Sequence, residues 1–136
     1  MPSIFEATAG EKIGIAVPFN SVTQGAGNET PAKTDPVTVN GLSGTIVTAD
    51  EAIPAKSRRN FVVTNSNVKR GDIVILNHSE GDPTDSGYNH NSKYAVSACA
   101  VTDGQFIIQI VHVEQESGSG NDTLFINFSI LKAVTH

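Results

Sequence analysis

The fold is decided by the stretch GQFIIQIVHVEQESGSGNDTLFINFSILKAV, residues Gly104–Val134. It holds two apolar and β-branched runs, Gln105–Val113 and Thr123–Lys132, separated by a polar connection of turn-forming residues. Every second residue from Leu124 to Ile130 is large and apolar, and a period of two places such side chains on one buried face of a strand. The stretch therefore predicts two long strands joined by a polar connection in an all-β domain.

The alternation in the second run predicts that its two phenylalanines lie on opposite faces of the strand. Phe128 shares a face with Ile126 and Ile130, so we expect it in the centre of the core. Phe125 points the other way, together with Leu131, and we expect it to serve packing between subunits more than folding. The alternation thus assigns a different role to each ring.

The chain from Val37 to Ala133 contains further short strands with turn residues between them. Asp103-Gly104 lies between two apolar runs and predicts a tight hairpin. We expect seven or eight strands in an antiparallel β-sandwich, jelly-roll-like or immunoglobulin-like, and the lack of a Cys…Trp…Cys pattern disfavours a true immunoglobulin domain. Asp72–Asn77 is apolar on both faces, which predicts a central strand. The other strands predicted before the final pair are Thr45–Thr48, Arg59–Thr64 and Lys93–Val101.

The N-terminal part differs in composition, so we divide the chain into an N-terminal arm, residues 1–36, and a β-sandwich domain, residues 37–136. The arm contains a short predicted strand in which Ile13, Ile15 and Val17 alternate with small residues. Asn20–Pro36 has a single large apolar residue, which cannot offset an ordering cost of about 1–2 kcal/mol per residue. Contacts from the protein's own sandwich, from a neighbouring copy or from a capsid surface must therefore order it, and we favour the last two. The predicted contact residues are Ile4, Phe5, Ile13, Val22 and Phe125.

Composition limits the partners. The formal net charge is −5, which argues against non-specific binding to nucleic acid. No run approaches the roughly 20 apolar residues of a membrane span, and the N-terminus shows no basic region followed by an apolar run, so we expect neither a membrane anchor nor a signal peptide. Cys99 is the only cysteine, and its apolar neighbours predict a buried, inert thiol.

Residues that carry chemistry are not arranged in a recognisable pattern. The four histidines, His78, His90, His112 and His136, have no metal-binding spacing, and the loops Glu80–Asn91 and Glu114–Asp122 do not match a calcium loop. No nucleophile elbow and no phosphate-binding glycine loop occurs. His78 and His112 lie at the ends of predicted strands, where we expect partly exposed rim residues, and an enzyme would need both of them and a carboxylate to converge in space. We therefore predict no catalytic, cofactor-binding or metal-binding residues and no enzymatic activity.

Residues 37–134 resemble a domain of virion structural proteins in tailed bacteriophages, especially marine ones. The resemblance lies in the order of six short motifs rather than in any one of them. The loop Glu80–Ser92 departs from the family pattern, which is shorter and richer in glycine. The motifs are Gly41–Thr48, Phe61–Ser66, Asp72–His78, Tyr94–Ala98, Gly104–Ile110 and Leu124–Leu131.

The resemblance implies a virion component without catalytic residues. It implies a capsid decoration or cement subunit, assembled in the host cytoplasm, that binds the major capsid protein and copies of itself on the outer surface of a phage head. Subunits of this kind commonly associate as trimers, so we expect a homotrimer. The alternative is a fibre or tail-tip binding module for carbohydrate or a host surface, with Tyr88–Asn91 supplying stacking and hydrogen bonds.

Overall fold

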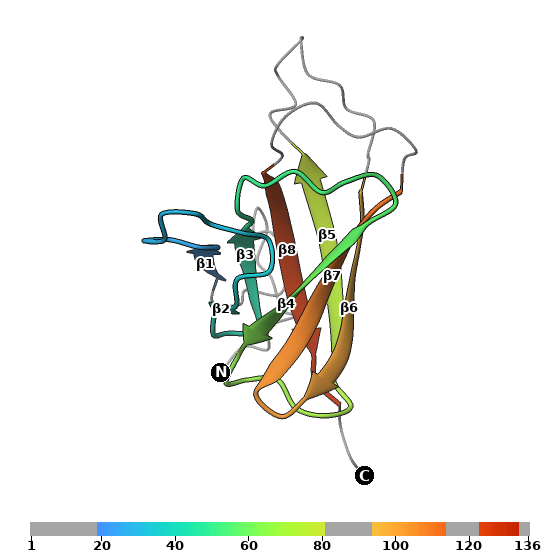
Figure 1. The fold of residues 1–136 in the computed structure, drawn as a ribbon. Helices are drawn as coiled ribbons and strands as arrows, with labels where there is room; N and C mark the ends of the chain where they lie inside the picture. The colour runs from blue at the N-terminus through green and yellow to red at the C-terminus, as the bar shows by residue number, and fades with distance from the viewer. Residues whose placement is uncertain (1–18, 81–93, 114–122, 134–136) are drawn as a thin grey trace, which may run out of the picture.

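The computed structural model describes residues 19–80, 94–113 and 123–133, and these contain strands and no helix. Sheet A has the strand order β1-β3-β8-β5, and sheet B has the order β2-β4-β7-β6 (Figure 1). The strands are β1 (Phe19–Thr23), β2 (Val37–Thr38), β3 (Ser43–Val47), β4 (Arg58–Thr64), β5 (Ile73–Glu80), β6 (Tyr94–Thr102), β7 (Gln105–His112) and β8 (Leu124–Leu131). The all-β prediction is confirmed.

Both sheets are mixed, whereas the sequence predicted antiparallel pairing throughout. β1 pairs with β3 in parallel, and β2 pairs with β4 in parallel. The other four pairings, β3–β8, β5–β8, β4–β7 and β6–β7, are antiparallel. From β1 to β4 the chain alternates between the two sheets. β3 therefore lies beside β1 in sheet A and β4 lies beside β2 in sheet B, and each runs in the same direction as its partner.

The two strands predicted from Gly104–Val134 are confirmed as β7 and β8, but they do not pair with each other. β7 lies between β4 and β6 in sheet B, whereas β8 lies between β3 and β5 in sheet A. Periodicity identifies a strand and its buried face, but it contains no information about the neighbouring strand. The predicted Asp103-Gly104 hairpin is confirmed between β6 and β7, with Gly104 at a φ of 84°.

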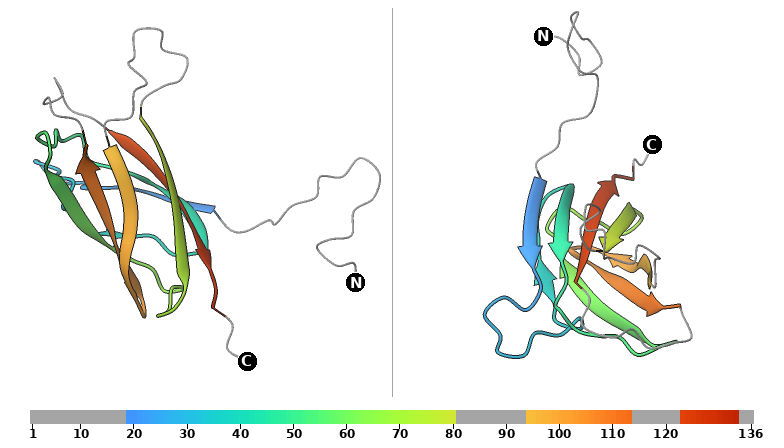
Figure 2. Two further views of the ribbon diagram at one scale, coloured as in Figure 1. Left: turned by 90° about the vertical axis from the view of Figure 1, so that its right-hand side faces the viewer. Right: turned by 90° about the horizontal axis from the view of Figure 1, so that it is seen from above.

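Figure 2 shows the strands of both sheets from two further directions. One cluster of buried side chains includes residues of both sheets. Phe106 of β7 and Phe128 of β8 meet there, with ring centroids 6.1 Å apart. Phe128 is 2% exposed, which confirms its predicted place in the core, while the Phe125 side chain lies on the opposite face of β8 and is 39% exposed.

The prediction that Asp72–Asn77 forms a central strand is wrong. β5 is the last strand of sheet A, and Ile73 and Ile75 are 60% and 50% exposed. The inward-facing Val74 and Leu76 pack against the core. The apolar residues on the outer face of β5 are therefore exposed isoleucines. They do not indicate a strand with neighbours on both sides.

The described part of the predicted arm, residues 19–36, lies against the protein's own sheets. β1 pairs with β3 over five residues, and the Gln24 and Lys33 side chains are buried. The contacts that order Asn20–Pro36 therefore come from this chain. Residues 1–18, which include the predicted strand, lie outside the described residues, and the division of the chain at Val37 stays a prediction.

Cys99 is exposed, so the predicted buried thiol is wrong. The cysteine lies on β6, an edge strand, at the start of a register shift between Cys99 and Thr102. Within the shift, Ala100 has a φ of 52°, a left-handed conformation that non-glycine residues rarely adopt. Cys99 follows the alternation of β6, in which Ala95, Ser97 and Cys99 are exposed while Tyr94, Val96 and Ala98 face inward, so the apolar neighbours on which the prediction depended did not indicate burial.

Candidate interaction surface

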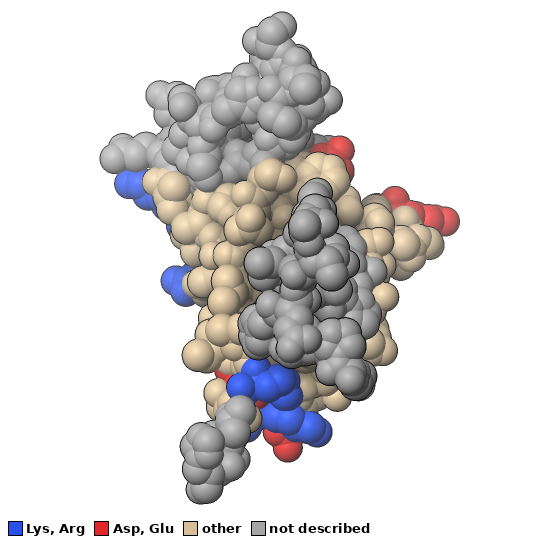
Figure 3. All heavy atoms as spheres, turned by 180° about the vertical axis from the view of Figure 1, so that it is seen from behind, with Lys and Arg blue, Asp and Glu red and all other residues tan. Residues whose placement is uncertain are grey.

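The outer face of sheet A carries no charged side chain on the three adjacent strands β3, β8 and β5. In Figure 3, which views the molecule from behind, most of the visible described atoms belong to neither acidic nor basic residues, and the charged side chains in view lie along the margins and at the lower end. We call this surface the uncharged face. Its residues are Thr45, Val47, Ile73, Ile75, Asn77, Ser79, Phe125, Asn127, Ser129 and Leu131.

Strand register brings the large apolar residues of this face together at two places. Ile73 lies opposite Leu131, which is 51% exposed, and Ile75 follows two residues later on the same face. Phe125 lies between Val47 of β3 and Ser79 of β5. Interface cores are depleted of charge and enriched in apolar and aromatic side chains, so this composition suits contact with another protein surface.

Asp72 and Lys132 anchor one end of the uncharged face. The Lys132 ammonium and the Ala133 N–H bind the Asp72 carboxylate at 2.5 and 2.8 Å, and the Lys69 N–H donates to it at 2.8 Å. The Lys132 hydrogen bond, followed by the Ala133 bond, lowers the pKa of Asp72 from its usual 3.8 to about 2. This ion pair connects the start of β5 to the residues that directly follow β8.

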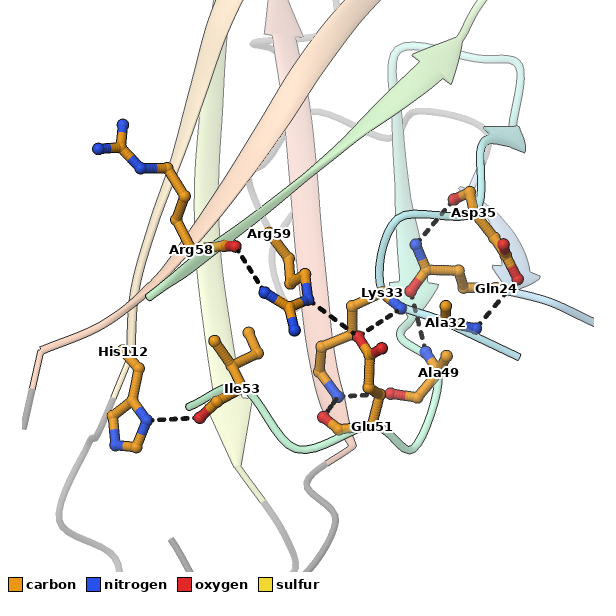
Figure 4. A network of polar contacts seen from close by, with 10 residues as sticks. All are labelled: Gln24, Ala32, Lys33, Asp35, Ala49, Glu51, Ile53, Arg58, Arg59 and His112. Atoms are coloured by element: carbon orange, nitrogen blue, oxygen red, sulfur yellow. Dashed lines mark hydrogen bonds and ion pairs between the residues drawn. The ribbon is translucent and has the colours of Figure 1, made fainter. Parts of the chain in front are cut away.

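Lys33 is fully buried at the centre of a second polar cluster (Figure 4). Its Nζ donates to the carbonyl oxygens of Ala49 and Glu51, both at 2.5 Å. Its backbone N–H donates to Glu51 Oε1 at 3.1 Å, and the same oxygen lies 3.4 Å from Arg59 Nε. A buried ammonium that binds backbone carbonyls fixes chain segments to one another.

Gln24 completes that cluster. Its Oε1 accepts from the Ala49 N–H at 3.0 Å, and its Nε2 donates to the Asp35 carbonyl at 2.8 Å. These bonds hold residues 24–35 against the connection between β3 and β4. The polar groups of Gln24 and Lys33 are engaged with backbone, so we assign the cluster to structure rather than to catalysis.

His112 was predicted to be a partly exposed rim residue, but its side chain is fully buried. Its Nδ1 lies 2.7 Å from the Ile53 carbonyl oxygen, and its ring centroid lies 5.2 Å from that of Tyr94. Its Nε2 is buried without a hydrogen-bond partner. His78 is half-buried on β5 in the other sheet.

Among residues 19–80, 94–113 and 123–133, no group of three or more His, Cys, Asp or Glu side chains could hold a metal ion. Convergence of His78, His112 and a carboxylate therefore has no support in this part of the chain. His90 and the two predicted acidic loops lie outside it. No helix in the described residues is long and apolar enough to cross a membrane.

The predicted contact residues fall in different environments. Ile4, Phe5 and Ile13 lie outside the described residues. Val22 is half-buried on β1 and packs against the core, whereas Phe125 lies on the uncharged face.

Sequence reasoning missed Ile73 and Ile75 as surface residues. The sequence signal for this surface was an apolar residue at every position from Ile73 to Leu76. This pattern fits a central strand, and it fits an edge strand with an apolar outer face equally well.

A hollow of about 450 Å³ lies beside residues 25–28 and 35–38. Its described lining is small and aliphatic or polar, including Val22, Asn28 and Asp35, and contains no aromatic side chain. The described residues of this hollow therefore include no aromatic ring on which a sugar could stack.

No family model matches the chain, and the comparisons with curated proteins and with solved structures returned no significant match.

Proposed function

We propose that this protein is a structural subunit of a tailed-phage virion, a decoration or cement protein that binds the outer surface of the head. The proposal begins from the ordered motifs by which residues 37–134 resemble virion domains. It includes binding to the major capsid protein, association into a homotrimer and the absence of enzymatic activity.

The observation that carries the proposal is the uncharged face. A chain with a formal net charge of −5 leaves ten outward positions over three adjacent strands without a charge, and four of these, Ile73, Ile75, Phe125 and Leu131, are exposed large hydrophobic residues. An exposed apolar surface of this kind marks a site of contact with another macromolecule. A subunit that works by docking on a shell needs such a surface and no catalytic group.

We also propose that the two sheets form a jelly-roll-like sandwich. The contact between Phe106 of sheet B and Phe128 of sheet A supports this packing, as does the shared core cluster. A sandwich leaves one outer face per sheet for partners.

The alternative is a fibre or tail-tip module that recognises carbohydrate or a host surface. Its predicted contact residues, Tyr88–Asn91, lie outside the described residues. No described aromatic residue lines the hollow beside residues 25–28, so we rank this function second.

Antibody labelling of virions tests the proposal. Gold-conjugated antibody against the full chain, applied to purified particles of the phage that encodes it, is expected to label the head surface. Labelling confined to fibres or the tail tip would favour the alternative, and particles without label would contradict both functions.

A further inference from the structure

We infer that the hollow beside residues 25–28 is a binding site for a basic side chain of a protein partner, and that the Asp35 carboxylate holds its charge. The inference goes beyond the uncharged face, because it names a second contact and the chemistry of the partner residue. It rests on the proposed function only for the identity of that partner, the major capsid protein.

The hollow lies between the end of β1 and β2, two strands that contact each other at one side of the molecule (Figure 1). Its volume of about 450 Å³ falls within the range of about 300–1,000 Å³ that is usual for ligand pockets. Part of its lining is aliphatic and comes from Val22, Pro36 and Val37. Aliphatic walls of this kind suit the methylene stem of a lysine or arginine side chain.

Asp35 gives the hollow its charge. Among the described lining residues it alone carries an ionisable side chain. Its Oδ2 accepts hydrogen bonds from Asn28 Nδ2 and from the Ala32 N–H, both at 3.1 Å. A carboxylate offers about four acceptor positions on two oxygens, so these bonds leave Oδ1 to accept from a ligand. Within the part of the chain that the structure describes, no basic side chain forms an ion pair with Asp35. A guanidinium or ammonium group would therefore form charge-assisted hydrogen bonds with it.

The turn beside the hollow is held in place before any ligand binds. The Gln24 side chain donates to the Asp35 carbonyl oxygen at 2.8 Å, and the Asn28 N–H donates to the Gly25 carbonyl oxygen at 3.0 Å. Gly25 has a φ of 71°, and a Cβ there would lie 2.9 Å from Asp35 Oδ2, so the turn packs directly against the carboxylate. Groups that are already fixed lose little conformational freedom on binding, which favours affinity.

The hollow borders the uncharged face. Thr23 lines the hollow, and strand register pairs Thr23 with Val47 and Val47 with Phe125. These three residues lie in one row across sheet A, so the hollow is about two strand spacings, or ~10 Å, from Phe125. A partner that covers Phe125 can therefore place a side chain in the hollow. The formal net charge of −5 favours approach of a basic partner surface.

Titration with a short peptide tests the site directly. The isotope-labelled full chain is titrated with acetyl-Gly-Arg-Gly-amide, and its amide chemical shifts are followed by NMR. We expect saturable shifts at residues 22–28 and 35–38, and weaker binding as added salt screens the charges. The matching citrulline peptide has nearly the same shape without the charge and should cause no shift. No shift with the arginine peptide, or equal shifts with both peptides, would overturn the inference.

Asp35→Asn is the deciding variant, because an asparagine oxygen can still accept from Asn28 and Ala32 while the charge is removed. We expect it to weaken binding of the arginine peptide about tenfold or more. Asp103→Asn removes an exposed carboxylate from the turn between β6 and β7, and this matched control should bind the peptide like the unmodified chain. Unchanged affinity in Asp35→Asn, or an equal loss in both variants, would overturn the inference.

Binding to phage heads separates this inference from the proposed function. We expect Asp35→Asn to weaken co-sedimentation with heads and Asp103→Asn to leave it unchanged. Undiminished head binding by Asp35→Asn would overturn the assignment of the hollow to the capsid protein and leave the virion role standing. Oligomers of the unmodified chain that dissociate in Asp35→Asn would assign the hollow to a second copy and overturn it as well. A chain that binds the arginine peptide through Asp35 but binds no head contradicts the virion role and leaves the site standing.

Discussion

At the residue scale, the core consists of side chains from both sheets that pack against one another. Phe128 is buried at 2% exposure and contacts Phe106 across the core, while Phe125, three residues earlier, is exposed on the uncharged face. The two rings offer a matched pair of substitutions on a single strand.

Phe128→Ala should lower the free energy of unfolding by about 3–5 kcal/mol, because it removes a large buried ring and leaves a cavity. Phe125→Ala should cost clearly less in a dilute monomer. Urea unfolding followed by circular dichroism measures both. Equal losses at the two positions would contradict the assigned faces.

Asp72 should make stability depend on pH under acidic conditions. Its pKa is about 2 in the folded protein and 3.8 ordinarily, so the bonded carboxylate stabilises the fold above about pH 4, and this contribution is lost as the pH falls towards 2. Asp72→Asn should be less stable than the unmodified chain at neutral pH, and the difference should shrink towards pH 2. Unfolding in urea at a series of pH values measures this, with Asp50→Asn as an exposed control. A difference that stays constant with pH would refute it.

At the element scale, β1 and β3 approach closely because β3 has a glycine at the contact. A Cβ on Gly44 would lie 2.4 Å from the Asn20 carbonyl oxygen and 2.9 Å from Phe128 Cε1. The position therefore couples the parallel β1–β3 pairing to the core.

Gly44→Ala should lower the free energy of unfolding by about 1–3 kcal/mol, as overpacking of a close contact does. It should also increase amide exchange across β1, because the new methyl group forces β1 and β3 apart. The neighbouring Thr45→Ala, which removes one exposed hydrogen bond to Asn127, is the control and should have a smaller effect. An unchanged amide exchange rate in β1 would mean that the two strands accommodate the methyl group without moving apart, and it would contradict the prediction.

The elements also show how far the sequence determines the fold. The alternation in β8 predicted its buried face residue by residue, because period two is a local property of a strand. The neighbours of β7 and β8 and the edge position of β5 depend on contacts between distant segments, and the prediction that β5 is central was wrong. Phe125 was predicted as a surface residue because Asn127 and Ser129 mark its face of β8 as polar, whereas Ile73 and Ile75 were not, because every residue from Ile73 to Leu76 is apolar.

At the scale of the whole molecule, residues 19–36 belong to the folded body through β1 and the buried Lys33 cluster. A chain that starts at Phe19 keeps these contacts, so it is the reference for a chain that starts at Val37 and lacks them. A chain that starts at Val37 should be less stable by about 3 kcal/mol or more, since it loses several buried hydrogen bonds worth about 1 kcal/mol each. Urea unfolding of the two truncated chains measures this, and equal stability would restore a domain boundary at Val37.

The proposed docking of this protein on a phage head is measured most directly by co-sedimentation. Empty heads from a phage that lacks this gene are mixed with increasing amounts of the purified full chain and pelleted. We expect saturable binding at a fixed number of copies per head, weakened by Leu131→Lys on the uncharged face and unaffected by Ser97→Lys on the other sheet. A full chain that remains in the supernatant at every concentration would contradict it.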